Sequence, residues 1–218
     1  VKTADSFACA LLMHCMRLGE RLHIEAPVSR TLLQNLDEYQ AAWRAFMPKV
    51  WKGVEVSAQS EVDFPPDPAL ANKAVIALSG GMDGAFSYFR HRDNVLARPF
   101  DITAAFLVHG FDSRLAHVGD FEFMRKSVTG MIGQDGVALY TIRTNLRDDA
   151  LAPNWSFAHG AGLAACAHFF AESHGVGLVG GDFKYNDFPD VWGSSPVTNH
   201  LLSSASLRMT YDGAGFSR

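Results

Sequence analysis

The sequence predicts an α/β fold in which a parallel sheet carries helices on both faces, preceded by a small α/β unit. From Lys73 onward, short apolar runs typical of strands alternate with longer helix-like segments. These segments are long enough to serve as right-handed crossovers between parallel strands. With 218 residues, 48% of them hydrophobic and 19% charged, the chain can bury one sizeable core and still form a smaller appendage.

Residues 1–66 are expected to form the small unit, with two helices and two short strands. Residues 21–25 alternate like a strand, and residues 54–56 are a second strand candidate. Ser29 is a candidate N-cap for the second helix. Apolar residues at helical spacing predict one buried face on each helix: Phe7, Leu11, Leu12, Cys15 and Met16 on the first, and Leu32, Leu33, Leu36, Tyr39, Trp43 and Phe46 on the second.

A proline-rich segment, Asp63-Phe64-Pro65-Pro66-Asp67-Pro68, separates this unit from the rest of the chain. Proline has no backbone donor, so the segment can continue neither a helix nor a strand ladder. The second unit is therefore expected to span residues 67–218. Its strands are predicted at 74–78, 103–109, 138–143 and 176–180, and its helices at 83–92, 120–133 and 157–174.

The loop after the first strand of the second unit is the strongest candidate for chemistry. It reads Ser79-Gly80-Gly81-Met82-Asp83-Gly84 and leads directly into a helix. A strand, glycine turn and helix place unpaired N–H groups and the positive helix end at the carboxyl edge of a sheet, which predicts an anion site. Glycine lets a phosphate approach the backbone, and Asp83 suits Mg²⁺ held against phosphate oxygens.

A plainer interpretation is a tight turn followed by an acid that the helix dipole favours. The apolar strand before the loop, the helix after it and the repeated β/α units together favour the anion site, because they agree at several levels.

At five of six positions the loop matches SGGxDS, and over roughly residues 70–190 the chain resembles the PP-loop superfamily of adenine-nucleotide alpha-hydrolase-like ATP pyrophosphatases. It is distantly similar to the synthetase domain of asparagine synthetase. The resemblance implies a Rossmann-like HUP domain, ATP and Mg²⁺ as cofactors, and cleavage of ATP to AMP and pyrophosphate to adenylate a small substrate. It also implies that Ser79, Gly80, Gly81 and Gly84 cradle the pyrophosphate while Asp83 holds the metal. Gly84 departs from the family, which usually has a serine there.

Other glycine patterns are weaker candidates. Gly175-Val-Gly177-Leu-Val-Gly180 fits the dinucleotide pattern G-x-G-x-x-G, but it fills a strand instead of joining a strand to a helix. Gly160-Ala-Gly162-Leu-Ala-Ala165 opens a helix, and close helix-to-sheet packing is favoured for it over dinucleotide binding. His159 and Gly160 could still face the nucleotide, because that helix is expected to begin at the same edge of the sheet.

Substrate candidates follow the other strands, because ligands of open α/β sheets lie at the carboxyl ends of strands. Val108 and His109 are placed to meet adenine or ribose, and Thr144, Asn145 and Arg147 follow the third strand. After the fourth strand come Lys184 as a catalytic cation and Tyr185 and Asn186 as substrate contacts, followed by Asn199 and His200 in the hydroxyl-rich segment 192–204. Each of these segments is equally compatible with a solvated loop.

Composition narrows the classes of function and partner. A formal net charge of −4 offers no basic field for nucleic acid or an anionic membrane, and no apolar run approaches the roughly 20 residues of a membrane span. Three cysteines without a CxxC pair are typical of a reducing cytoplasm. We therefore expect a cytoplasmic protein acting on a small molecule, with a homodimer as a compatible assembly.

Two functions from different classes are compatible with these features. The first is an ATP-dependent ligase or transferase that adenylates its substrate. The second is a nucleotide-binding sensor or accessory subunit whose loop, altered at Gly84, binds without turnover.

Overall fold

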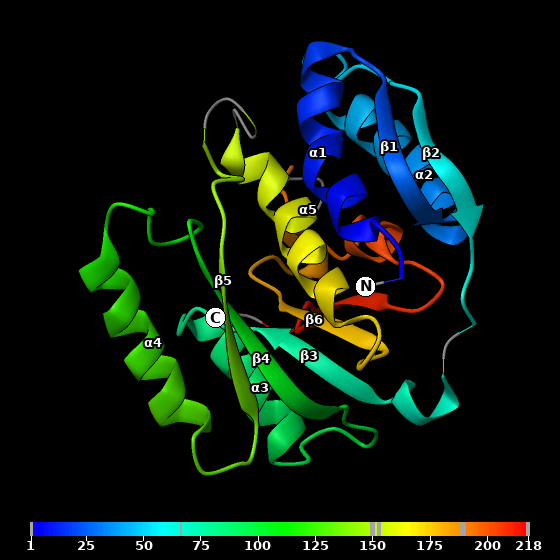
Figure 1. Cartoon of the computed structure of the whole chain (residues 1–218). Coiled ribbons are helices and arrows are strands. Elements are labelled where there is room, and N and C mark those ends of the chain that lie inside the picture. Colours follow the sequence, from blue (N-terminus) through cyan, green and yellow to red (C-terminus); the bar gives the residue numbers. More distant parts are fainter. Residues whose placement is uncertain (1, 66, 149–150, 152–153, 188–190, 217–218) are drawn as a thin grey trace.

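The computed structural model describes residues 2–65, 67–148, 151, 154–187 and 191–216 (Figure 1). Its centre is a five-stranded parallel sheet in the order β5-β4-β3-β6-β7. The strands are β3 (Lys73–Ala77), β4 (Asp101–His109), β5 (Ala138–Arg143), β6 (Val176–Gly180) and β7 (Arg208–Asp212). Helices flank the sheet, so the predicted α/β class with a parallel sheet is confirmed.

The helices of this unit lie on two faces of the sheet. Their bounds are α3 (Met82–Arg92), α4 (Val118–Ile132) and α5 (Trp155–Ala167). Side chains alternate along β3, as period-2 geometry requires. Ala74 and Ile76 share one hydrophobic cluster with Tyr88 of α3, whereas Val75 belongs to the cluster that contains α5. The strand is buried on both sides after Lys73, which explains why its sequence is apolar from Ala74 to Ala77.

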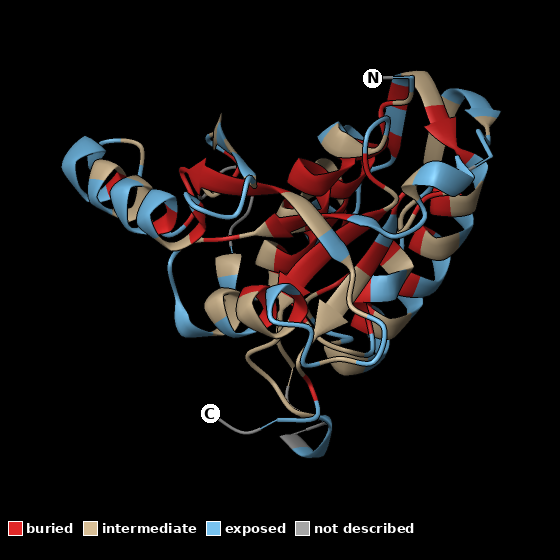
Figure 2. Ribbon diagram, turned by 90° about the horizontal axis from the view of Figure 1, so that it is seen from below, coloured by how far each residue is buried: buried red, intermediate tan, exposed pale blue. Residues whose placement is uncertain are grey.

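Burial is concentrated in the sheet and at its helix contacts (Figure 2). On α4 only a narrow stripe, Phe121, Val128 and Ile132, is buried. This helix therefore covers the sheet with one edge and leaves the rest of its surface in solvent.

The N-terminal elements pack against α5. They are α1 (Asp5–Leu18), β1 (Leu22–Ser29), α2 (Arg30–Phe46) and β2 (Val56–Val62), with β1 and β2 paired in parallel. As predicted, Ser29 caps α2, because its hydroxyl accepts a hydrogen bond of 3.3 Å from Leu32 N. Buried residues of these elements and of α5 form one continuous cluster. Figure 1 shows α1 lying alongside α5.

The buried face of α1 includes Leu12 and Met16, as predicted, but it does not include Phe7. Phe7 is 56% exposed, whereas Ala8, Cys9 and Met13 are buried. The prediction included Phe7 because of its large apolar side chain. Small residues let α1 approach α5 closely, and the helix is turned so that Phe7 lies outside the buried face.

Two further differences concern the end of the chain. Helix α5 ends at Ala167 and continues only as a short 3-10 helix, η2 (His168–Phe170), although a helix to 174 was expected. Strand β7 was not predicted, because Arg208-Met-Thr-Tyr-Asp212 has charged ends and little apolar character. The remaining short helices are η1 (Pro68–Leu70), η3 (Tyr185–Asp187) and η4 (Asn199–Leu202).

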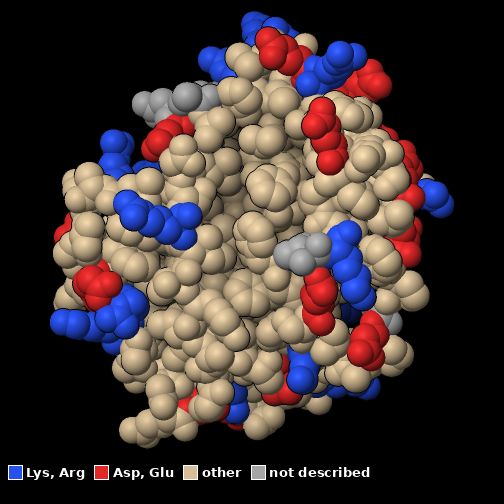
Figure 3. Space-filling model, viewed as in Figure 1, with Lys and Arg blue, Asp and Glu red and all other residues tan. Residues whose placement is uncertain are grey.

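Helix α5 contains no Asp, Glu, Lys or Arg, and charged side chains lie mostly around the margin of the face shown in Figure 3. Among the described residues, no helix is both long enough and apolar enough to cross a membrane.

Candidate functional site

A pocket with an empty volume of about 600 Å³ opens at the carboxyl ends of β3, β4 and β6. Four residues of the predicted loop line it: Ser79, Gly81, Asp83 and Gly84. Val108, the predicted contact at the end of β4, lines it as well. The remaining lining residues are apolar, apart from the glycine at the end of β6, and come from all three strands, from Phe111 and from Leu163 of α5. The strand order changes direction here, with β4 on one side of β3 and β6 on the other.

The backbone of the loop explains its two glycines. Gly80 has φ of +84°, a left-handed conformation that a residue with a Cβ adopts only under strain. Gly81 has φ of −74° and is the N-cap of α3, where it provides no side chain to bond the first N–H groups of the helix. Those N–H groups are therefore available to a ligand at the positive end of an 11-residue helix.

Close packing against β6 holds the first turn of α3 in place. A Cβ on Gly180 would lie 2.5 Å from the carbonyl oxygen of Asp83 and 2.7 Å from the nitrogen of Gly84. On the other side, a Cβ on Gly84 would lie 3.1 Å from Leu78 Cδ2 and 3.2 Å from the oxygen of Ala77. Gly84 and Gly180 thus let the helix start lie directly against the ends of two strands.

A metal at this site would depend on phosphate for most of its ligands. Within the described part of the chain, no group of three or more His, Cys, Asp or Glu residues is placed to hold an ion. Asp83 lines the pocket and offers one carboxylate. One carboxylate, phosphate oxygens and water form a donor set that suits Mg²⁺.

His109, expected to meet adenine or ribose, does not line this pocket. Its ring stacks on Phe121 with centroids 4.4 Å apart, and its Nε2 lies 3.1 Å from the oxygen of Arg114. Side chains alternate along a strand, so Val108 and His109 face opposite sides of β4. His109 therefore positions the loop that follows β4.

The glycines of α5 serve close packing. A Cβ on Gly160 would lie 1.9 Å from the oxygen of Gly193, and one on Gly162 would meet the rings of Trp155 at 2.9 Å and Phe111 at 3.2 Å. Gly160 thus contacts a loop backbone instead of the pocket. His159, its neighbour, packs against Trp192 with ring centroids 5.2 Å apart, and burial lowers its pKa.

The segment after β6 lies at the same edge of the sheet as the pocket. Tyr211 holds it, because its hydroxyl donates to the oxygen of Phe183 at 2.9 Å and lies 3.3 Å from Asp182 Oδ1. Burial raises the pKa of Tyr211, and the charges of Asp182 and Asp83 act in the same direction. Lys184 is half-buried, whereas Tyr185 and Asn186 are exposed, and none of the three lines the pocket.

Asn199 and His200 lie apart from the pocket. Asn199 is buried, and its amide accepts from Ser195 N and donates to Ser194 Oγ, both at 2.9 Å. It therefore shapes its own turn. His200 is exposed on η4.

Two residues that the sequence did not single out belong to the site: Leu163 and Tyr211. Leu163 is an ordinary apolar residue in the sequence, and Tyr211 belongs to the strand that was not predicted. Their only signal is spatial, because each comes from a different element.

Comparison of the chain with protein-family models, with curated proteins and with solved structures finds no match in any of the three. The resemblance to PP-loop proteins therefore depends on the loop 79–84 and on its place in the fold.

Proposed function

We propose that the chain binds ATP with its phosphates on the loop 79–84 and uses it to adenylate a small substrate. One observation carries this proposal: the loop with the SGGxD pattern forms a wall of the pocket at the point where the strand order reverses. Backbone N–H groups at a helix start suit a phosphate, and the apolar strand ends suit a nucleoside.

The proposed reaction needs no covalent protein intermediate. An oxygen of the substrate attacks the α-phosphorus of ATP, and the bond between the α-phosphorus and the bridging oxygen breaks to release pyrophosphate. The adenylated substrate is then open to a second nucleophile that displaces AMP. The protein contributes positioning and stabilisation of the charge that develops on the phosphate oxygens.

Loop residues divide this work between them. The N–H groups at the start of α3 would bind the departing pyrophosphate. Ser79, the first residue of the loop, lines the pocket and supplies a hydroxyl. Asp83 would hold Mg²⁺, which neutralises charge on the phosphate chain. Lys184 and its neighbours Tyr185 and Asn186 remain the proposed substrate contacts after β6, because substrate choice must come from outside the phosphate loop.

The decisive experiment measures ATP binding and product formation separately. ATP and Mg²⁺ are incubated with the protein and a panel of small carboxylates, amides and nucleobases. Formation of AMP and pyrophosphate supports the enzyme, and tight ATP binding without products supports a sensor or accessory subunit. Absence of ATP binding would overturn both.

A variant at Gly81 locates the bound nucleotide. A Cβ on Gly81 would lie 3.5 Å from Ser79 Oγ, which is an ordinary contact distance. The φ of Gly81 is −74°, which any residue can adopt. Gly81→Val should therefore fold normally while its methyl groups block a phosphate from the backbone. We expect ATP affinity to fall about tenfold or more, as for loss of close-range charge-assisted bonds. Unchanged affinity in the folded variant would refute the site.

A further inference from the structure

A second cavity adjoins the proposed nucleotide pocket at the carboxyl edge of the sheet. Its empty volume is about 1120 Å³, and it lies between the loop after β4, the loop after β5 and the start of α5. The described residues that line it are Gly110, Arg114, Leu115, Ala116, Arg147, Asp148 and Trp155. It thus combines two guanidinium groups and one carboxylate with an apolar surface.

Arg147 is held in place before any ligand binds. Its Nη1 donates to the oxygen of Phe111, and its guanidinium carbon lies 5.9 Å from the centre of the Trp155 ring. A cation held between a carbonyl and an aromatic ring loses less side-chain entropy on binding an anion than a free one does. Nη1 is taken by the carbonyl, which leaves the other N–H groups of the fork for a ligand.

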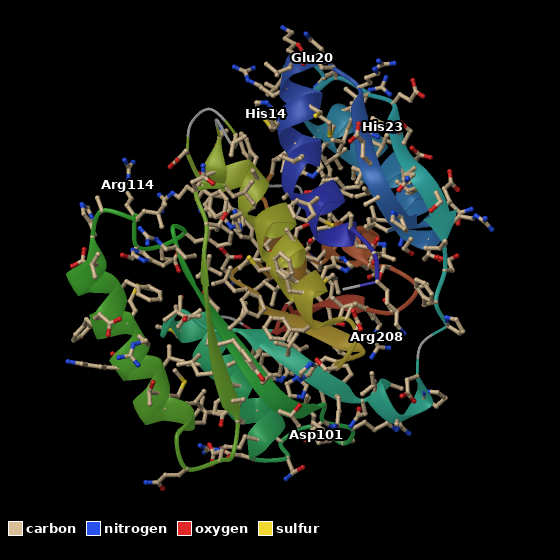
Figure 4. The ribbon with its side chains drawn as sticks, viewed as in Figure 1. His14, Glu20, His23, Asp101, Arg114 and Arg208 are labelled. Atoms are coloured by element: carbon tan, nitrogen blue, oxygen red, sulfur yellow. The ribbon has the colours of Figure 1, made fainter. Side chains whose placement is uncertain are left out.

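Arg114 belongs to a loop that is fixed by its backbone. Gly110 N donates to the oxygen of Ser113 at 2.8 Å, and His109 Nε2 lies 3.1 Å from the oxygen of Arg114. Gly110 has φ of +115°, and a Cβ there would lie 1.8 Å from the oxygen of Thr144. Figure 4 shows Arg114 projecting from this loop between β4 and α4, at the end of β4 opposite Asp101.

Neither arginine is neutralised by a described side chain. Across the described residues, no carboxylate lies within ion-pair distance of Arg114 or Arg147. Asp148 lines the same cavity without pairing with them, so the described lining residues carry two positive charges and one negative charge. An anionic group is therefore the ligand chemistry that these side chains recognise.

An aromatic pair divides this cavity from the nucleotide pocket. Phe111 lines the pocket and Trp155 lines the cavity, and their ring centroids are 4.4 Å apart. Gly162 allows this arrangement, because a Cβ there would lie 2.9 Å from Trp155. A ligand in the cavity is therefore separated from a nucleotide in the pocket by the thickness of one pair of rings.

We propose that this cavity binds a small organic carboxylate, with the carboxylate between Arg114 and Arg147 and its apolar body against Leu115 and Trp155. The inference goes beyond the proposed function: the cavity is a second anion site beside the nucleotide pocket, and the rings of Phe111 and Trp155 keep the bound acid out of that pocket. Binding of the anion itself requires no nucleotide and is measured without it.

The test uses 2-aminobenzoate, a carboxylate on a flat apolar ring, and its uncharged analogue 2-aminobenzamide. Binding to the full chain is followed by calorimetry and by Trp fluorescence. We expect the carboxylate to bind about tenfold or more tightly than the amide, the order expected for one charge-assisted hydrogen bond. Equal binding of the two probes would overturn the inference.

Two variants assign the binding to this cavity. Arg114→Gln should weaken 2-aminobenzoate about tenfold and leave ATP affinity unchanged. Arg98→Gln, an exposed arginine before β4 at the opposite edge, is the matched control and should change neither. If Arg114→Gln bound the carboxylate like the parent chain, or if AMP displaced the carboxylate competitively, the cavity would not be a separate acid site.

The results separate this inference from the proposed function. Carboxylate binding without any ATP binding would leave the acid site in place and remove the adenylating activity. ATP binding without a preference for the carboxylate over the amide would leave the nucleotide site and remove the acid site.

Discussion

Gly180, the last residue of β6, lies so close to Asp83 that a Cβ on the glycine would come within 2.5 Å of the Asp83 carbonyl oxygen. The contact is between two backbones, so no side-chain rotation can relieve it. The position of the loop 79–84 therefore depends on a residue 97 positions later in the chain (180 − 83), and the absence of a side chain at Gly180 is part of the candidate site.

Gly180→Ala should move the first turn of α3 away from β6. We expect a loss of about 1–3 kcal/mol of unfolding free energy, as for overpacking in a tight core. ATP affinity should fall about tenfold or more, because the N–H groups at the helix start are displaced. Chemical denaturation and ATP titration of the same preparation measure both effects.

Gly130→Ala is the matched control for this substitution. Gly130 lies within α4, and a Cβ there meets nothing within 4 Å. Alanine should raise stability by about 0.5–1 kcal/mol, because it restricts the unfolded chain and favours the helix. If Gly180→Ala behaved like Gly130→Ala, the close contact would have no energetic consequence.

Asp83→Asn should separate metal binding from nucleotide binding. The amide keeps the shape of the side chain but removes the negative charge that Mg²⁺ requires. We expect Mg²⁺-dependent pyrophosphate release to fall by about 10²-fold, the order found for removal of one stabilising group at a reacting centre. ATP binding in the presence of a chelator should change much less. An equal loss of both would make Asp83 purely structural.

Stability is expected to fall as the solution is acidified below about pH 6.5, in part through His168. Burial lowers the pKa of His168 from its ordinary 6.5, against the opposing charge of Asp5 and the hydrogen bond to the oxygen of Leu202. The unfolded chain therefore takes up a proton at a higher pH than the folded chain does. Stability from this residue is complete above the unfolded pKa and is lost as the pH falls below it.

His168→Gln tests this pH dependence. Nε2 of His168 lies 2.9 Å from the Leu202 oxygen, and a glutamine amide can donate the same bond without titrating. The stability gap between the parent and the variant should narrow between about pH 7 and pH 5, by at most about 1.4 kcal/mol per pH unit. Urea titrations across this range measure the gap. A constant gap would mean that His168 does not titrate with unfolding. His159 and His174, whose pKa values are also lowered mainly by burial, are present in both proteins and cancel in the comparison.

The β/α units could be predicted from the sequence because each unit has a local sequence pattern that indicates its structure. The strand before Ser79 is apolar throughout, Gly80 needs a positive φ, and Ser29 caps its helix. Strand β7 has no such signal. It exists because Gly177 leaves room for Met209, whose sulfur would lie 2.7 Å from a Cβ there.

The candidate site was predictable where its residues are consecutive and, in addition, at Val108 near the end of β4. The loop 79–84 could be found from one motif, and its lining of the pocket follows from the turn at the end of β3. His109 was expected to meet adenine or ribose but does not line this pocket, because the end of a strand indicates an edge but not which face a side chain takes. The pairing of Phe111 with Trp155 depends on α5 crossing the sheet, which no local pattern encodes.

Lys184→Ala should impair substrate-dependent AMP formation without affecting ATP binding. Lys184 follows β6 in the segment that Tyr211 holds, and it does not line the proposed nucleotide pocket. We expect turnover to fall about 10²-fold if its cation stabilises the transferring phosphate or an anionic substrate. Lys126→Ala, on the exposed part of α4, should leave turnover unchanged. If Lys184→Ala lost ATP affinity to the same extent as turnover, this lysine would contact the nucleotide instead of the substrate.

Gly84 is the position where the loop departs from SGGxDS, and restoring the serine should have two opposite effects. A Cβ there approaches Leu78 Cδ2 at 3.1 Å and the Ala77 oxygen at 3.2 Å, so the first turn of α3 must shift by a few tenths of an ångström. This crowding should cost about 1 kcal/mol, part of which is offset because glycine is a poor helix former.

Gly84→Ala carries the same Cβ without the hydroxyl and so isolates the steric effect. Both variants should therefore lose similar stability, whereas only Gly84→Ser adds a donor for the leaving pyrophosphate. We expect pyrophosphate release by Gly84→Ser to exceed that of Gly84→Ala by about tenfold, the order of one hydrogen bond to a charged group. Equal release by the two variants would mean that the serine hydroxyl has no role in this loop, and that the chain has adapted to the glycine.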